Sequence, residues 1–347
     1  MMTNSGRLLT LVLLVNFFTG CSTVGFYHQS TAGHLALLAK QEPIADIVND
    51  STRDKKLIEQ LVLAQELRTF ASTDLMLPEN ESYRSYIQLE RRYVAWHVFA
   101  APEFSVTLQK WCFLAVDCMQ YRRYFDKHKA RAYAAKLAAT GQDVYVAGVP
   151  AYSTLAPLVS SMLNQGEIAT ASYIFHELAH QQLYVHSNST FNESFATAVE
   201  ELGIRHWLQQ QGRQDELLRY ENWLTQKAAF ANLILDTRQE FHELYESGLP
   251  VEMMRSEKQK LISILQQRFE NLKQSNNLLQ RYEKWMLGPL NNAQLGVIAV
   301  YRDQVPFFKQ LFLACGSDFE KFYLRSEEIS KLTAKERQSA LEVSQQC

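Results

Sequence analysis

The stretch IFHELAHQQLYVHSNSTFNESFATAVE, residues 174–200, decides the fold of the middle of the chain and carries its candidate chemistry. His176 and His180 are four residues apart, so on a helix both rings lie on one face, one turn from each other. Two neutral imidazoles at this spacing can bind one zinc ion, and Glu177 can accept a proton from a water held there. The pattern therefore predicts a zinc site on a helix.

A catalytic zinc site needs a third protein ligand, and Glu193 is the candidate. The segment between His180 and Glu193 contains turn formers and ends at Thr190, so the chain can reverse and begin a second, antiparallel helix there. Glu193, in the first turn of that helix, could then face both histidines. An alternative stays open, because Thr190 and Glu193 also form a capping-box pattern, in which the glutamate closes the helix start.

Two further polar residues are predicted to support the ligands. Glu200 is seven residues after Glu193, on the same helix face, and could orient a histidine; an exposed or salt-bridged glutamate is the alternative. Asn192 would frame the carboxylate of Glu193. Both are candidate supporting residues rather than ligands.

The HExxH pattern of His176, Glu177 and His180 is typical of zinc peptidases. Hydrolysis at such a site would also need a donor for the oxyanion, and three tyrosines are candidates: Tyr152, Tyr184 and Tyr301. Tyr184 follows His180 at i+4, which places it on the ligand face of the helix, near the helix end. Core packing is the alternative role for each tyrosine.

The segment DVYVAGVPAYS, residues 143–153, is typical of a strand that stops near Pro150. An extended peptide could pair with such a strand, and an internal strand without a ligand is the alternative. The residues predicted to line the substrate are Val146, Gly148, Val149 and Ala151.

The rest of the chain is mainly helical in pattern. Two or three helices are expected before residue 80, a two-stranded hairpin over residues 93–114, and a helix over residues 124–141 that ends at Gly141. From about residue 167 onward the periodicity is almost wholly helical. We therefore predict an α+β fold, predominantly α-helical, with one small sheet placed before the histidine helix.

Composition and charge narrow the classes of partner. The chain has 347 residues, 47% of them hydrophobic, which is enough for a sizeable core. Its formal net charge is -2, without the basic excess that phosphate binding demands. We therefore expect no nucleic-acid partner.

The first residues have the layout of a secretory signal. Arg7 precedes an apolar run over residues 8–18 that is too short to span a membrane. Thr19, Gly20 and Cys21 follow, a segment that resembles a bacterial lipobox, in which Cys21 would be acylated and become the mature N-terminus. Ser22 resembles the sorting signal for the outer membrane. An ordinary signal peptide or an uncleaved anchor is the alternative.

Four cysteines remain after Cys21, an even number for an oxidising compartment. Short spans cost least to close, so locality favours the pairs Cys112–Cys118 and Cys315–Cys347. Free buried thiols are the alternative.

Five segments together resemble the bacterial putative zinc aminopeptidase family of exported proteins. They are YHQSTAGHLALLAKQEPI (27–44), WHVFAAPEFSVTLQKWCFLAVDC (96–118), DVYVAGVPAYSTL (143–155), FHELAHQQLYV with FNESFATAVE (175–200) and PLNNAQLGVIAVYRDQVPFF (289–308). After residue 155 the chain departs from that family, because Ala156, Pro157 and Leu158 stand in place of a Gly-aromatic segment. The Gly-x-Met-Glu-Asn segment of classical zinc aminopeptidases is not found.

The resemblance implies a zincin-like core with one zinc ion held by His176, His180 and Glu193, and with Glu177 as the base. It implies four parts: a signal peptide (1–20), an N-terminal helical segment (21–80), a zincin-like catalytic region (81–212) and a helical region that closes the cleft (213–347).

Two function classes follow. The first is a zinc-dependent peptidase, expected to be an aminopeptidase, exported and lipid-anchored at the outer membrane facing the periplasm, with a peptide substrate. The second is an envelope-anchored helical scaffold or binding protein with a vestigial or structural metal site. The sequence does not indicate an oligomeric state.

Overall fold

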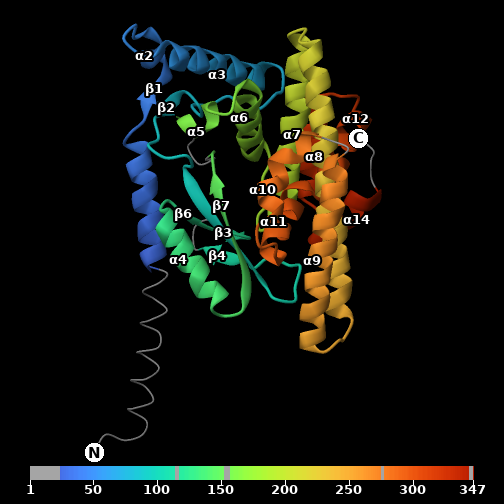
Figure 1. Ribbon diagram of the computed structural model, residues 1–347. Coiled ribbons are helices and arrows are strands. Elements are labelled where there is room, and N and C mark those ends of the chain that lie inside the picture. The colour runs from blue at the N-terminus through green and yellow to red at the C-terminus, as the bar shows by residue number, and fades with distance from the viewer. Residues whose placement is uncertain (1–23, 114–116, 152–156, 275–276, 344–346) are drawn as a thin grey trace, which may run out of the picture.

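The computed structural model describes residues 24–113, 117–151, 157–274, 277–343 and 347. Helices account for most of these residues, and the strands form small sheets (Figure 1). The predicted α+β class with helical dominance is therefore confirmed. The prediction of one small sheet is wrong, because the described strands form three separate sheets. Within the described residues, no helix is both long and apolar enough to cross a membrane.

The first half of the chain mixes helices with short strands. Its elements are a helix over residues 24–38, β1 (Glu42–Pro43), α2 (Ile44–Asn49), α3 (Lys55–Thr73), β2 (Ser85–Ile87), β3 (Ala95–Pro102), β4 (Trp111–Phe113), β5 (Asp117–Met119), β6 (Arg122–Tyr124), α4 (Lys127–Ala138), β7 (Gln142–Val149), β8 (Leu158–Val159) and α5 (Ser160–Leu163).

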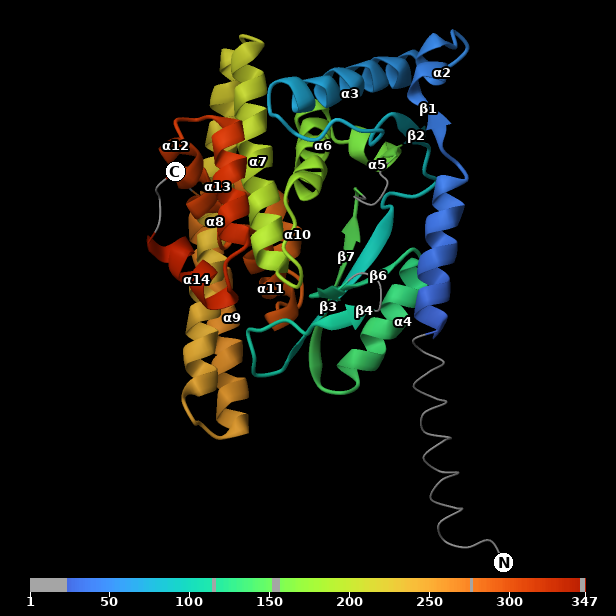
Figure 2. The same cartoon turned by 180° about the vertical axis from the view of Figure 1, so that it is seen from behind.

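The second half is helical, as the periodicity predicts. Its elements are α6 (Glu167–Gln182), α7 (Ser189–Gln210), α8 (Gln214–Glu246), α9 (Val251–Gln274), the 3-10 helix η1 (Asn277–Tyr282), α10 (Glu283–Met286), α11 (Asn292–Arg302), α12 (Val305–Ala314), α13 (Phe319–Ser330) and α14 (Ala334–Val343). The long α8 and α9 stand side by side along one edge of the molecule (Figures 1 and 2).

The central sheet has the order β6–β3–β7, with both neighbours antiparallel to β3. The predicted hairpin over residues 93–114 is therefore wrong. β4 pairs with β5 instead, and the disulfide between Cys112 and Cys118 joins directly opposed residues of that pair. Seven of the eight residues of β3 are buried. A central strand covered on both faces is buried in this way, whereas one arm of an isolated hairpin would expose one face.

The two faces of this sheet pack against different helices. Trp96 and Val98 of β3 belong to an apolar cluster with Ala130 of α4, whereas Phe99 packs with Val300 of α11. Alternation along the strand sends successive side chains to opposite faces. The sheet therefore lies between α4 and α11, which Figure 1 shows on its two sides.

The largest core cluster joins distant parts of the chain. It draws on α3, α6, α7, α12 and α13, with buried members from Leu37 to Ile329. A second cluster lies between α8, α9 and η1. The disulfide between Cys315 and Cys347 links the end of α12 to the last residue. The division into four parts stays a prediction, since one core includes residues from three of them.

Candidate metal centre and cleft

Helix α6 positions the two histidines. Gly166 precedes its first residue with a φ of +91°, a backbone conformation that glycine adopts without strain. Ile174, Phe175 and Leu178 face the core and are fully buried. His176 and His180 occupy another face of the helix, with their ring centroids 4.8 Å apart.

A short loop returns the chain as α7, which packs against α6. Asn188 is the N-cap residue, and its side-chain oxygen accepts a hydrogen bond from the Phe191 amide. The capping-box alternative for Thr190 and Glu193 is therefore wrong, because the helix begins before Thr190. Glu193 lies in the second turn rather than the first, where it is largely buried.

Asn192, which was expected to frame the Glu193 carboxylate, instead binds the backbone of Val185. Its side chain accepts a hydrogen bond from the Val185 amide and donates one to the Val185 carbonyl, both at 2.8 Å. Asn192 thus fastens the α6–α7 loop to the start of α7. It acts on the position of Glu193 through the backbone and not through a contact with a histidine.

The three predicted ligands come together. One ligand atom from each of His176, His180 and Glu193 lies within 4.8 Å of the other two. Glu193 Oε2 is 3.3 Å from His176 Nε2 and 3.5 Å from His180 Nε2. Two imidazole nitrogens and one carboxylate oxygen are a donor set that zinc prefers, so these residues fit the ion.

Glu200 holds the other nitrogen of the first histidine. Its Oε2 is 3.1 Å from His176 Nδ1, and its Oε1 accepts a hydrogen bond of 2.5 Å from the Ser172 hydroxyl. A proton on Nδ1 leaves Nε2 of His176 as the free donor nitrogen for a metal. His180 Nδ1 is buried and has no such partner among the residues that the structure describes.

The pKa values of the ligands reflect this crowding of charges. Burial lowers the pKa of His176, but hydrogen bonds with Glu193 and Glu200 act against burial and raise it to about 10. Burial raises the pKa of Glu193, yet the two histidines bring it well below its ordinary value. Without a metal, His176 is therefore protonated and Glu193 ionised at neutral pH.

A cleft of about 320 Å³ opens beside the histidines. Glu177 and Tyr301 line it together with His176, and the Tyr301 ring stacks on that of His176 at 6.3 Å between centroids. Burial, followed by the negative charges of Glu193 and Glu177, raises the pKa of Tyr301 well above its ordinary value. Tyr301 is thus a neutral phenol that can donate a hydrogen bond into the cleft.

Of the other two candidate tyrosines, Tyr184 does not line the cleft. α6 ends at Gln182, and Leu183 is extended, so the i+4 relation of Tyr184 to His180 is lost. Tyr184 is 43% exposed, and its hydroxyl contacts the Met119 sulfur at 3.7 Å. The expectation that it shares the ligand face is wrong. Tyr152 lies outside the described residues, as does the acylation candidate Cys21.

The predicted substrate strand is β7, which has one partner strand, β3, among the described residues. Val149 and Ala151 line the cleft, although Ala151 lies beyond the end of the strand. Val146 belongs to the cluster with α4, and an added Cβ on Gly148 would collide with Tyr93. Those two residues therefore face away from the cleft, and only their backbone could meet a peptide.

Sequence reasoning missed three residues on the sheet face toward the site. The His97 ring stacks on the Tyr121 ring, with 3.8 Å between centroids, and accepts a hydrogen bond from Arg123. Burial and the Arg123 charge lower the pKa of His97 well below its ordinary value, while Glu193 acts to raise it. Burial raises the pKa of Tyr121 to about 12. The pairing of β3 with β6 sets His97 opposite Arg123, and Tyr121, just before β6, stacks on His97, so no local pattern could identify these residues.

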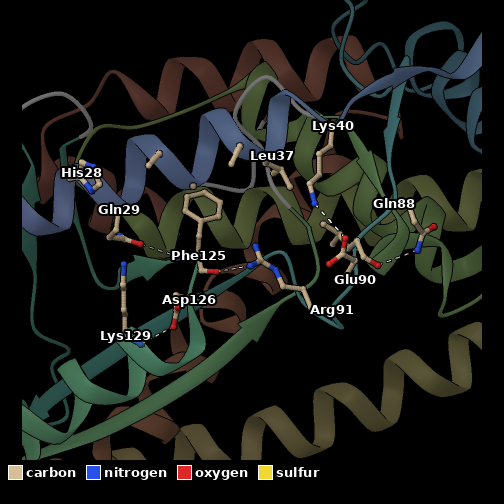
Figure 3. Close-up of a pocket in the computed structure, with 14 residues that line it drawn as sticks. His28, Gln29, Leu37, Lys40, Gln88, Glu90, Arg91, Phe125, Asp126 and Lys129 are labelled. Carbon is tan, nitrogen blue, oxygen red and sulfur yellow. Dashed lines mark hydrogen bonds and ion pairs between the residues drawn. The ribbon is translucent and has the colours of Figure 1, made fainter.

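A second groove, of about 400 Å³, lies between the helix over residues 24–38 and the start of α4 (Figure 3). Its polar groups are already paired: Lys40 with Glu90, Arg91 with the carbonyls of Phe125 and Val94, and Asp126 with the Lys129 amide. It contains none of the three candidate ligands.

A family model described as "Putative aminopeptidase" matches residues 25–341 of the chain. The match defines the class of the protein as a peptidase. In particular, the chain belongs to the putative aminopeptidase family. No curated protein and no solved structure matches it.

Proposed function

We propose that the protein is a zinc-dependent peptidase with a zincin-like core, and that it acts as an aminopeptidase. The observation that carries the proposal is the meeting of His176, His180 and Glu193 ligand atoms within 4.8 Å, beside Glu177 on the same helix. Bound zinc supplies Lewis acidity and lowers the pKa of a water molecule to about 7.

The chain's own residues supply proton transfer and positioning. Glu177 takes a proton from the attacking water and returns it to the leaving amine. Tyr301, whose burial keeps its proton in place, donates a hydrogen bond to the oxyanion that develops on the scissile carbonyl. The edge of β7 near Val149 pairs with the backbone of the substrate.

The test replaces the proposed base, Glu177, and keeps the three candidate zinc ligands unchanged. Glu177→Gln is expected to abolish hydrolysis of a peptide panel while zinc binding, followed by metal analysis, is retained. Glu59→Gln, the same change on an exposed position of α3, is the matched control and should keep full activity. Retained turnover by Glu177→Gln removes it as the base.

The same peptide panel tests whether the protein is an aminopeptidase or an endopeptidase. Cleavage of unblocked peptides but not of their N-acetylated forms supports an aminopeptidase, whereas cleavage of both indicates an endopeptidase. Zinc bound by the wild type with no hydrolysis of any peptide favours the alternative, an envelope-anchored scaffold with a structural metal.

We also propose that the protein is exported and anchored by a lipid on Cys21, at the outer membrane facing the periplasm. The lipobox-like segment supports this, and two disulfides suit an oxidising compartment. Labelled palmitate should be incorporated by the wild type and not by Cys21→Ser. Equal labelling of the two proteins contradicts the anchor, and density-gradient separation of membranes tests its location.

A further inference from the structure

The cleft beside the histidines is lined by two cations as well as by the groups already described. They are Lys227 of α8 and Arg302 of α11. Its remaining walls are largely apolar, with contributions from Val149, Phe230 and Val297. Charges in such a setting interact more strongly than they do in water.

Both cations contact a carboxylate beneath the cleft. Glu201 is fully buried, and its Oε1 is 3.3 Å from Lys227 Nζ and 2.5 Å from Arg302 Nη1. A third cation, Lys309 of α12, lies 3.1 Å from Oε2 but does not line the cleft. One buried carboxylate therefore holds three cations.

Glu200, a second carboxylate near these cations, does not neutralise their remaining positive charge. Glu200 is 4.0 Å from Lys227 and already accepts from Ser172 and His176. Within this cluster three cations meet two carboxylates, which leaves one positive charge; Glu177, the third carboxylate of the cleft, pairs with none of the three cations among the described residues. The neighbouring acids are engaged elsewhere: Glu221 pairs with Arg205, and the Arg238 charge acts on Asp303.

Arg302 also has an unused donor. Its side chain is 11% exposed, and its Nε is buried without a hydrogen-bond partner among the residues that the structure describes. The carboxylates that line the cleft are Glu177 and Glu200, and Glu200 is committed to its partners. The part of the cleft at Lys227 and Arg302 therefore suits an anionic group.

We infer that the cleft selects peptides with a carboxylate next to the scissile bond, and that Lys227 and Arg302 bind it. The inference rests on the proposed function. The carboxylate comes either from an acidic side chain or from a free C-terminus, since both present the same two oxygens to these cations.

The experiment measures binding without turnover. Zinc-loaded Glu177→Gln protein is titrated calorimetrically with two matched pairs, Ala-Glu-NH₂ against Ala-Gln-NH₂ and Ala-Ala against Ala-Ala-NH₂. At least one pair should bind about tenfold more tightly in its carboxylate form, the size expected for hydrogen bonds to a charged group. The first pair reports a side chain and the second a C-terminus.

Three further variants test the role of Lys227. Added to the same background, Lys227→Gln should remove the preference, and Lys227→Arg should restore it. Lys309→Gln also removes a positive charge that pairs with Glu201, but outside the cleft, so this variant should retain the preference for the carboxylate peptide. A preference that survives Lys227→Gln, or is lost equally in Lys309→Gln, overturns the assignment.

The ratio of affinities within each peptide pair is measured on the Glu177→Gln protein, so it does not depend on whether any Lys227 variant folds. Equal affinity within both pairs, or no binding of any of the four peptides, overturns the inference. Hydrolysis of all four peptides by the wild type at equal kcat/KM also overturns the inference, but it agrees with the proposed peptidase function. A carboxylate preference in binding with no hydrolysis by the wild type contradicts the peptidase proposal alone.

Discussion

At the scale of single residues, Glu200 fixes which nitrogen of His176 can bind a metal. Its contact with Nδ1 at 3.1 Å orients the ring, and Glu200→Gln removes the charge behind it. We expect zinc affinity to fall by about 10- to 100-fold, measured by competition with a chromophoric chelator. Glu216→Gln, on α8, is the control that should keep wild-type affinity. Unchanged affinity in Glu200→Gln contradicts this role.

The protonation of His176 has a consequence for metal uptake. Its pKa of about 10 in the metal-free protein lies above the ordinary value, so a proton occupies the ring at neutral pH and competes with zinc. Zinc binding at pH 7 should release about one proton for this residue, and affinity should rise with pH between 6 and 8. Calorimetry in buffers of different protonation enthalpy measures the release; a heat independent of the buffer refutes it.

Tyr301 and Tyr184 form a natural pair for testing the oxyanion donor. Tyr301→Phe removes the hydroxyl at the cleft and should lower kcat by about 100-fold or more, with zinc affinity unchanged. Tyr184→Phe makes the same change on an exposed tyrosine beyond the end of α6 and should keep kcat. Steady-state kinetics on one unblocked peptide compares them, and equal kcat values remove Tyr301 from the reaction.

At the scale of elements, Glu201 joins α7 to α8, α11 and α12 through its three cations. Burial raises its pKa, but Lys227, Arg302 and Lys309 outweigh burial and lower it to about 2. A lowered pKa in the folded state means that this stabilisation is present above about pH 4.5 and is lost as the pH falls toward 2.

Glu201→Gln leaves three cations without their carboxylate and should reduce the free energy of unfolding at pH 7 by about 3 kcal/mol. Denaturant titrations between pH 4.5 and 2 should also show a weaker pH dependence than in the wild type. Glu221→Gln breaks a more exposed pair and should cost less than about 1 kcal/mol. Equal losses in both variants contradict a special role for Glu201.

The elements also show where local patterns suffice. Helical periodicity predicted the α6–α7 pair and the long α8 and α9, because each depends on an apolar stripe that the sequence contains. It did not predict the N-cap at Asn188, since several turn formers stand side by side there. Strand pairing was predicted wrongly, because two apolar runs near each other do not reveal that β6 and β7 flank β3.

At the scale of the whole molecule, metal and fold should be linked. The candidate ligands come from two helices that both belong to the main core, so an ion there binds the folded state and not the unfolded chain. Zinc at about 1,000 times its Kd should add about 4 kcal/mol of stability. Thermal unfolding should show a higher Tm with zinc than with chelator, and no zinc-dependent change in His180→Ala.

The sequence by itself determined the helical class, the spacing of His176 and His180 and the nomination of Glu193, because a helix converts spacing into a shared face. Only the tertiary structure decided what surrounds them. Arg123 reaches the site through the pairing of β6 with β3, and Tyr121 through its stacking on His97. Lys227 and Arg302 meet at Glu201 through the packing of α8 and α11 on α7. Such contacts join residues far apart in the chain, and their geometry depends on how whole elements pack, which no local pattern contains.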